Sequence, residues 1–266
     1  MTRARYLRID LLALAFAALA LLPAPAMAEL VIGAARVVVA DVSAESSVAS
    51  RRLAAADEVR YKELIATERG SAAVIQFVDA TELAIGEQAR VRLDEFVFDP
   101  GAVGKLDLTL EFGALRFSTG SMAKPAYRIA TPSAALAVRG TEFDLAVDGD
   151  GATYLMVRHG AVEVTARNGE SKQVGAGQSL TVSAAGVPAE PRIAAAAPVG
   201  ALPGKIAAMD AALAGALAAA SDSDLDDLSV LAKARALRSG TRPDLGRPEK
   251  PDKLGKDKKA GKPGPR

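Results

Sequence analysis

The stretch Thr131-Pro132-Ser133-Ala134-Ala135-Leu136-Ala137-Val138-Arg139-Gly140-Thr141-Glu142-Phe143 is the most informative part of this 266-residue chain. Its small residues lead into an alternating pattern with apolar residues at every second position: Phe143, Leu145 and Val147. Alternation of this kind indicates a strand with one buried face. Asp148-Gly149-Asp150-Gly151 follows, and these residues tolerate positive φ angles. We therefore expect a half-buried strand that starts after a corner at Gly140 and ends in a hairpin turn.

Similar patterns extend outward in both directions, over residues 30–182. Two internal echoes indicate a repeated hairpin unit, since Leu110–Phe117 reads like Val157–Val164 and Ala80–Ile85 reads like Gly140–Leu145. The first pair carries a glycine at the same place, which is typical of a bend where a strand turns a corner. The sequence predicts an all-β fold of stacked antiparallel hairpins, forming either a two-sheet sandwich or a short solenoid-like stack.

These residues resemble the FecR domain family, whose pattern joins a Thr-Pro and small residues to Val-Arg-Gly-Thr and a Phe. The resemblance continues through Gly160–Val164 and ends with Ala176–Val182, the family's usual terminal strand. It implies a non-enzymatic periplasmic all-β module. In known members this module relays between an outer-membrane transporter and an anti-sigma factor.

The N-terminus predicts export. Three arginines, Arg3, Arg5 and Arg8, precede an apolar run at Leu11–Leu22 and a small-residue cleavage site at Ala26-Met27-Ala28. The apolar run is shorter than the roughly twenty residues that a spanning helix needs. We expect a signal peptide over residues 1–28 and a periplasmic or secreted mature chain that is not integral to the membrane, with an uncleaved anchor as the alternative.

The rest of the chain divides by composition. We expect the FecR-like β domain at 29–185 and a Pro/Ala-rich linker at 186–204. An alanine-rich helical segment with leucines at helical spacing follows at 205–240. The last part, 241–266, is rich in Pro, Gly and Lys, which predicts a disordered basic tail.

Composition narrows the functions that fit. The chain has no cysteine, which excludes disulfides and thiolate metal sites, and no glycine-rich phosphate motif, so we expect no cofactor. The formal net charge of +1 argues against nucleic acid as a partner. Residues 247–266 are locally basic, and this tail could touch anionic envelope surfaces or simply be solvated.

The candidate site is the motif of Val138, Arg139, Gly140, Thr141 and Phe143, which is either a binding motif or a fold-defining one. The planar guanidinium of Arg139 could take a partner's carboxylate or bond carbonyls freed by the bend. We favour the structural role, because the flanking residues are small and apolar.

Two other patterns suggest chemistry only superficially. His159 is the single histidine, and no catalytic or zinc-binding partners stand at matched spacing, so we expect a surface residue. Asp148-Gly149-Asp150-Gly151 is similar to the start of a calcium loop but lacks the later acidic ligands, which favours a tight turn.

We therefore expect a non-enzymatic protein-interaction or scaffolding module of the cell envelope, whose envelope protein partner the sequence does not identify. The first alternative is a component of a cell-surface signalling system that regulates a sigma factor or a TonB-dependent transporter. The second is an envelope glycan-acting enzyme, which lacks an evident acid/base pair.

Overall fold

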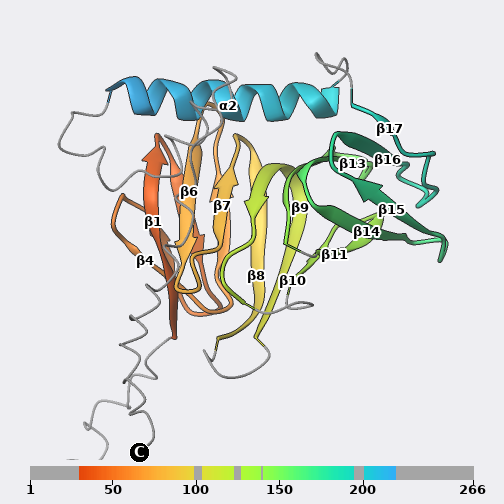
Figure 1. Ribbon diagram of the computed structural model, residues 1–266. Helices are drawn as coiled ribbons and strands as arrows, with labels where there is room; N and C mark the ends of the chain where they lie inside the picture. Colours follow the sequence, from red (N-terminus) through yellow and green to blue (C-terminus); the bar gives the residue numbers. More distant parts are fainter. Residues whose placement is uncertain (1–29, 99–103, 123–126, 139, 195–200, 220–266) are drawn as a thin grey trace, which may run out of the picture.

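The computed structural model describes residues 30–98, 104–122, 127–138, 140–194 and 201–219 (Figure 1). The described part consists of seventeen strands and one helix, which confirms the all-β prediction. The strands are β1 (Val31–Val39), β2 (Val42–Glu45), β3 (Ser50–Arg52), β4 (Glu58–Arg60), β5 (Leu64–Thr67), β6 (Ala72–Phe77), β7 (Glu82–Ile85), β8 (Ala89–Val97), β9 (Lys105–Ser118), β10 (Tyr127–Ala130), β11 (Ala134–Val138), β12 (Glu142–Val147), β13 (Thr153–His159), β14 (Ala161–Ala166), β15 (Ser171–Gly175), β16 (Gln178–Val182) and β17 (Arg192–Ile193). The helix is α2 (Ala201–Ala219).

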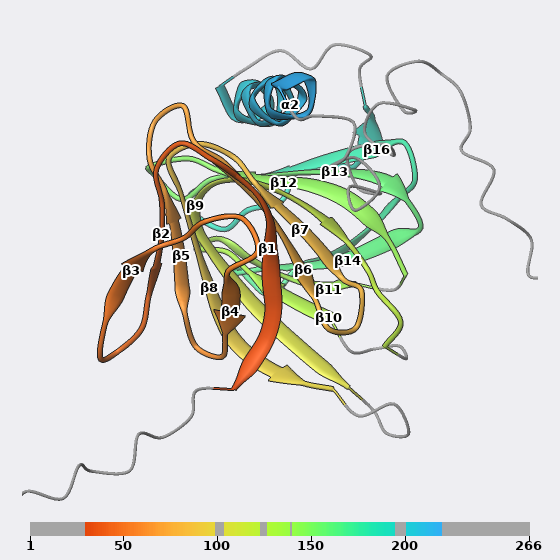
Figure 2. The ribbon, with the colours of Figure 1, turned by 90° about the vertical axis from the view of Figure 1, so that its left-hand side faces the viewer.

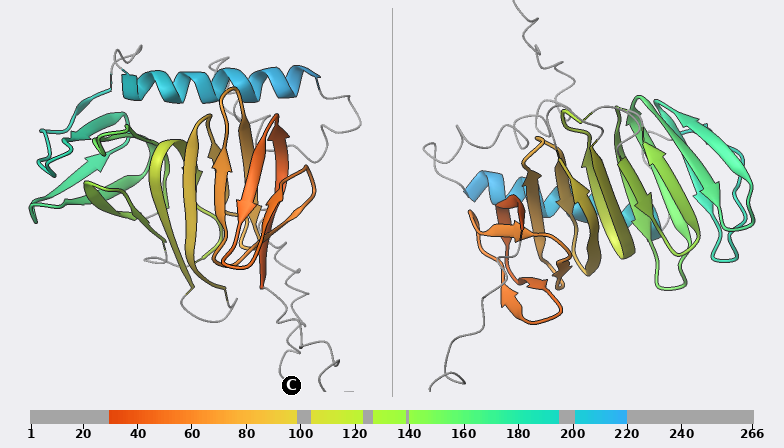
Figure 3. Two further views of the ribbon diagram at one scale, coloured as in Figure 1. Left: turned by 180° about the vertical axis from the view of Figure 1, so that it is seen from behind. Right: turned by 90° about the horizontal axis from the view of Figure 1, so that it is seen from below.

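The strands form two facing layers that share β9. The covered sheet, named for the helix that lies on it, has the order β4-β1-β6-β7-β9-β12-β13-β16-β17. The open sheet has the order β3-β2-β5-β8-β9-β10-β11-β14-β15. Pairing is antiparallel except between β9 and β10, which run parallel. Figure 3 shows the strands side by side along one axis. The hairpins are therefore stacked along that axis, and the stack has two sheets.

Strand β9 passes from one layer to the other at Gly113. Its first half pairs with β8 in the open sheet and its second half with β7 and β12 in the covered sheet. The φ angle of Gly113 is 100°, and an added Cβ would lie 2.3 Å from the Cβ of Ala89. Only glycine fits a backbone that is both left-handed and this crowded.

The internal echoes in the sequence correspond to strands in equivalent places. Leu83 of β7 and Phe143 of β12 both pair with Phe117, on the two sides of β9. Gly160 has a positive φ like Gly113 and likewise stands where the chain changes sheets, between β13 and β14. The repeats in the sequence therefore mark repeated crossings between layers.

The core lies between the two sheets and rests on aliphatic residues with a few aromatic rings. Phe117 is central, because its ring lies 5.5 Å from that of Phe143 and 5.7 Å from that of Tyr127. Phe77 and Phe96 stack at 5.8 Å nearer the N-terminal end. Offset and edge-on pairs of this kind stabilise a core beyond the area that they bury.

Helix α2 lies across the outer face of the covered sheet (Figures 1 and 2). It buries Ile206, Met209 and Leu213 against the sheet. Gly86 makes room for Met209, since an added Cβ there would lie 3.0 Å from the Cβ of Met209. Each of the three side chains contributes roughly 1.5–3 kcal/mol of burial energy.

Because α2 covers this sheet, one expectation about the burial of β12 does not hold. The alternating pattern predicts that Asp144 and Ala146 lie on a solvated face, but the side chains of both are fully buried. The prediction that β12 is half-buried was wrong, because α2 packs on the face that the alternating pattern assigned to solvent. A helix far along the chain leaves no signal in the local alternation.

Beyond β16, ordered contacts extend past residue 185. β17 pairs with β16, and Pro188 forms an isolated bridge with Val182, so part of the expected linker at 186–204 belongs to the sheet. α2 begins at Ala201, four residues before the expected helical segment. The expected signal peptide at 1–28, the expected helical segment beyond residue 219 and the expected tail at 241–266 lie outside the described residues.

Within the described ranges, no helix has the length and hydropathy that a bilayer crossing requires.

Candidate functional site

The motif singled out in the sequence forms the corner between the two sheets. Val138 ends β11 in the open sheet and Phe143 lies in β12 of the covered sheet, so the chain changes layers between them. Both side chains are fully buried, and Gly140 has a φ of 63°. Arg139 lies outside the described residues.

Packing at this corner is tight. An added Cβ at Gly160 would lie 2.5 Å from Cγ2 of Thr141 and 2.6 Å from the carbonyl oxygen of Gly140. The backbone N–H of Thr119 donates to the carbonyl of Thr141 at 3.1 Å. Oγ1 of Thr141 is buried and has no hydrogen-bond partner among the described residues. The described members of the motif thus fix the path of the chain, while a binding or structural role for Arg139 stays a prediction.

The equivalent corner of the first half holds a buried polar cluster that the sequence reasoning missed. The hydroxyl groups of Thr81 and Tyr127 both donate to Oδ2 of Asp79, at 2.6 and 3.0 Å. The N–H of Met122 donates to the Tyr127 hydroxyl at 3.2 Å. Burial, reinforced by the neighbouring Asp79, raises the pKa of Tyr127 above its usual value. The echo of Gly140–Leu145 in Ala80–Ile85 was the signal that could have located this cluster.

His159 and the Asp-Gly turn lie on the surface. Nδ1 of His159 lies 3.3 Å from Oε2 of Glu142, and the histidine side chain is 66% exposed. Oδ1 of Asp148 accepts from the N–H groups of Asp150 and Ala152 at 3.1 and 2.9 Å, which closes a tight turn. The described residues hold no group of three side chains that could ligate a metal ion.

The outer face of the open sheet carries a groove of about 380 Å³ that crosses β8, β9, β10, β11 and β14. Its lining includes three alanines: Ala130, Ala135 and Ala137. Arg128 faces Asp107 across the parallel pairing of β10 and β9. Because alanine side chains are short, the strands leave a trough instead of a raised surface.

Two polar groups in this groove are unused within the described part of the chain. Arg128 is exposed, and none of the hydrogen bonds or ion pairs found between described residues involves its side chain. Oδ1 of Asp107 is buried and has no hydrogen-bond partner, although Oδ2 lies 3.0 Å from Nζ of Lys105. A donor and an acceptor therefore stand side by side on an alanine-lined floor.

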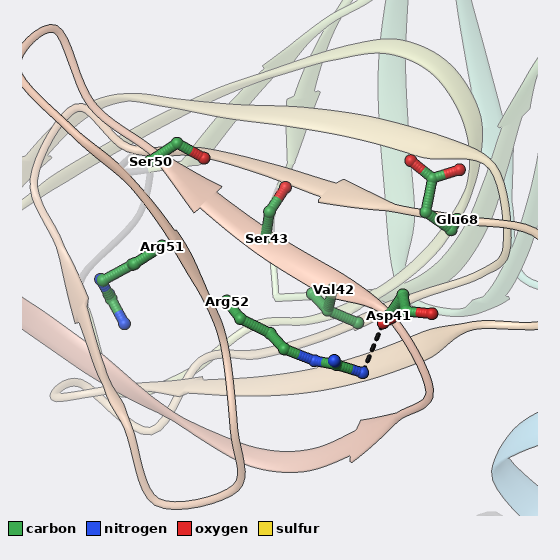
Figure 4. Close-up of a pocket in the computed structure, with 7 residues that line it drawn as sticks. All are labelled: Asp41, Val42, Ser43, Ser50, Arg51, Arg52 and Glu68. Carbon is green, nitrogen blue, oxygen red and sulfur yellow. Dashed lines mark ion pairs between the residues drawn. The ribbon is translucent and has the colours of Figure 1, made fainter.

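A second pocket, of about 220 Å³, lies at β2 and β3 near the N-terminal end of the stack (Figure 4). Here the charges are already paired. Arg52 binds Asp41, and NH2 of Arg51 lies 2.9 Å from Oε1 of the buried Glu63. The groove on the open sheet is the stronger candidate, because the side chain of Arg128 there has no partner among the described residues.

Comparison with known proteins matches the central part of this architecture to one family. Residues 63–163 match the model of a family described as FecR protein. This span contains the corner at Val138–Phe143 and all the groove residues except Thr165. No curated protein matches the chain.

Two crystal structures of a proposed anti-sigma factor from Parabacteroides distasonis ATCC 8503 are partly similar. The structure at 1.65 Å resolution is 19% identical with a TM-score of 0.40, and the structure at 2.50 Å is 17% identical with a TM-score of 0.39. Each comparison covers 48% of this chain and 57% of the other, so the chain spans a little over half the length of that protein.

Proposed function

Because the match over residues 63–163 identifies the chain as a FecR-domain protein, we propose that it is a non-enzymatic protein-interaction module of the cell envelope. In this proposal the groove on the open sheet is the docking surface. The single observation that carries it is the exposed Arg128, whose side chain pairs with no described residue, beside the alanine-lined floor. An extended segment of a partner protein offers backbone carbonyls or a carboxylate to this guanidinium.

Charge arguments favour a ligand at this place. The exposed guanidinium of Arg128 has no described partner and keeps its donors for a ligand. Arg128 on an exposed strand position can bind a carbonyl or carboxylate without first breaking an ion pair to a described residue. A face built in this way gains more from a polar backbone than from an apolar ligand.

Photo-crosslinking tests this proposal. A photoreactive amino acid at Ala135 or Ala137 should crosslink one envelope protein in cells, and Arg128→Glu in the same chain should reduce the yield at least fivefold. Val48 provides the matched control, because it is 81% exposed and lies between β2 and β3, away from the groove. Equal yields at Val48 and Ala135, or no effect of Arg128→Glu, would rule out the groove as the docking surface.

The FecR family also supports a second candidate, a component of cell-surface signalling that acts on a sigma factor or a TonB-dependent transporter. Deletion of the gene distinguishes the two roles. A signalling component changes the transcription of sigma-dependent genes, and Arg128→Glu should copy that change. A scaffold leaves transcription as it is and loses the crosslinked complex instead.

Localisation in the periplasm or outside the cell is part of the proposal. The N-terminal residues support it through their charge, their apolar run and their small-residue cleavage site. Mass spectrometry of the exported protein should find Glu29 as the first residue. An intact chain in the inner membrane would replace this proposal with an anchored form.

A further inference from the structure

The outer face of the covered sheet is shaped to hold a helix. Small or flat side chains form a floor under α2, which we call the helix seat: Ala72, Val74, Ala84, Ala114, Ala146 and Tyr154. Gly86 adds a notch that receives Met209. Alanines and a glycine on neighbouring strands let a helix approach closely, and the resulting trough is filled by Ile206 and Leu213 on either side of Met209.

The helix seat also carries an excess positive charge, which favours a carboxylate on the helix that covers it. Asp144 is fully buried and is held by two arginines, with 2.6 Å to Nε of Arg116 and 2.6 Å to NH2 of Arg158. Two guanidinium groups around one carboxylate give this cluster a net charge of one positive unit. Asp210 of α2 neutralises that charge, because its Oδ1 lies 2.9 Å from NH1 of Arg116.

The seat and its cover lie on different sides of the boundary of the matched segment. Every residue of the helix seat lies within the 63–163 segment that matches the family, as do Arg116, Asp144 and Arg158. α2 lies outside it. The matched segment of this chain therefore holds the apolar trough and the excess arginine, and an element outside that segment fills the trough.

α2 is held more weakly than the strands beneath it. It contacts the protein through one face, with three large apolar side chains and the Asp210 ion pair. Its opposite face, which includes Ala207, Ala211 and Gly215, is exposed. Elements with few buried contacts open at lower free energy than the core to which they are attached.

We propose that the helix seat is a second docking surface, which α2 covers within the chain and which an alanine-rich helix of a partner protein occupies when α2 lifts. The partner helix carries an apolar residue for the notch at Gly86 and, one residue later, a carboxylate for Arg116. This surface is separate from the groove on the open sheet, so either proposal can fail without the other.

Cysteine labelling tests whether α2 lifts. The chain has no cysteine, so a single introduced thiol reports on one site. Ala146→Cys lies in the helix seat and Ala35→Cys in the core between the sheets, and both alanines are fully buried. Under native conditions a thiol reagent should modify Ala146→Cys at least tenfold faster than Ala35→Cys. Equal rates would show that the seat opens only on global unfolding, which overturns the proposal.

A peptide with the sequence of residues 201–219 tests whether the seat accepts a helix from outside. Asp210→Arg places a positive charge beside Arg116 and loosens the chain's own helix, so this variant should bind the fluorescent peptide at least tenfold more tightly than the wild-type chain. The same peptide carrying Asp210→Arg should not bind. Failure of the Asp210→Arg chain to bind the unmodified peptide would overturn the proposal, provided that circular dichroism shows its β-sheet intact.

A disulfide lock supplies the matched control. With Gly86→Cys and Met209→Cys in one chain, the two Cβ atoms lie close enough for a disulfide to form after a small shift. The oxidised chain should bind no peptide, and reduction should make binding measurable, although weaker than in the wild type because Gly86→Cys narrows the notch. Binding that is equal before and after reduction would place the peptide elsewhere. Dimers of the wild-type chain at micromolar concentration would also overturn the assignment to a partner protein, because α2 of a second copy would then fill the seat.

Discussion

The two outer faces of the stack begin from the same kind of strand and end in different environments. On the covered sheet, Arg116, Asp144 and Arg158 are packed beneath α2 and form a closed ion-pair chain. On the open sheet, Arg128 and Asp107 stand on neighbouring strands at the surface. The difference is that the charges beneath α2 are all paired with one another, whereas Arg128 on the open sheet has no ion-pair partner among the described residues.

The largest expected effect comes from removing the acid at the centre of the covered face. Asp144→Ala leaves two arginines beneath α2 without their carboxylate, so it should lower the free energy of unfolding by about 3–5 kcal/mol. Glu163→Ala, at an exposed position of the open sheet, should change it by less than about 0.5 kcal/mol. Urea denaturation of both variants measures the contrast, and similar losses would break the distinction between the faces.

The next effect concerns the apolar hold of the cover. Met209→Ala empties the notch at Gly86 and should cost roughly 2–3 kcal/mol, at the lower end for methionine because the helix can settle toward the sheet. Hydrogen exchange should show the loss in α2 and leave the strands protected. Val48→Ala is the control, since Val48 is exposed and should be nearly neutral. Loss of protection throughout both sheets would mean that the cover and the core unfold as one unit.

Between the two faces, Tyr127→Phe should lower the free energy of unfolding by about 1–2 kcal/mol, because the N–H of Met122 loses its acceptor. The pH dependence sharpens this test. The folded state raises the pKa of Tyr127, so the unfolded chain releases that proton first and stability falls as the pH rises past about 10. The difference between wild type and Tyr127→Phe should therefore shrink above that pH. A constant difference would contradict the raised pKa.

The smallest expected effect on stability lies in the groove. Arg128→Ala removes a side chain that makes no bond to the described residues, so thermal unfolding should change by less than about 0.5 kcal/mol. Binding to the crosslinked partner should fall in the same variant. A large loss of stability would show that Arg128 is structural, and the two faces would then be alike.

The sequence predicted the parts of this architecture that depend on local pattern. Alternation located β9 and the inward residues of β12, and glycines at positions 113, 140 and 160 marked the crossings between sheets. The groove and the ion-pair chain could not be predicted in this way. Arg116 meets Asp210 from 94 positions away, and no spacing rule links residues so distant.

The candidate site was predicted in part. The motif around Gly140 does form a corner, but its described side chains are buried and are not accessible to a partner. Arg128 and Asp107 belong to different strands that become neighbours only through the one parallel pairing in the stack. Such a pairing joins strands that are not consecutive in a hairpin, so turn signals do not reveal it.

The shared strand β9 sets the order in which this protein can be assembled. It pairs with β7 and β8, which precede it, and with β10 and β12, which follow it. A nascent chain that has released β1 to β8 therefore holds two unfinished sheets whose free edges await the same segment. Until residue 118 emerges, those edges are open to pairing with other chains, and after that β9 itself forms the edge of both sheets until β10 and β12 follow.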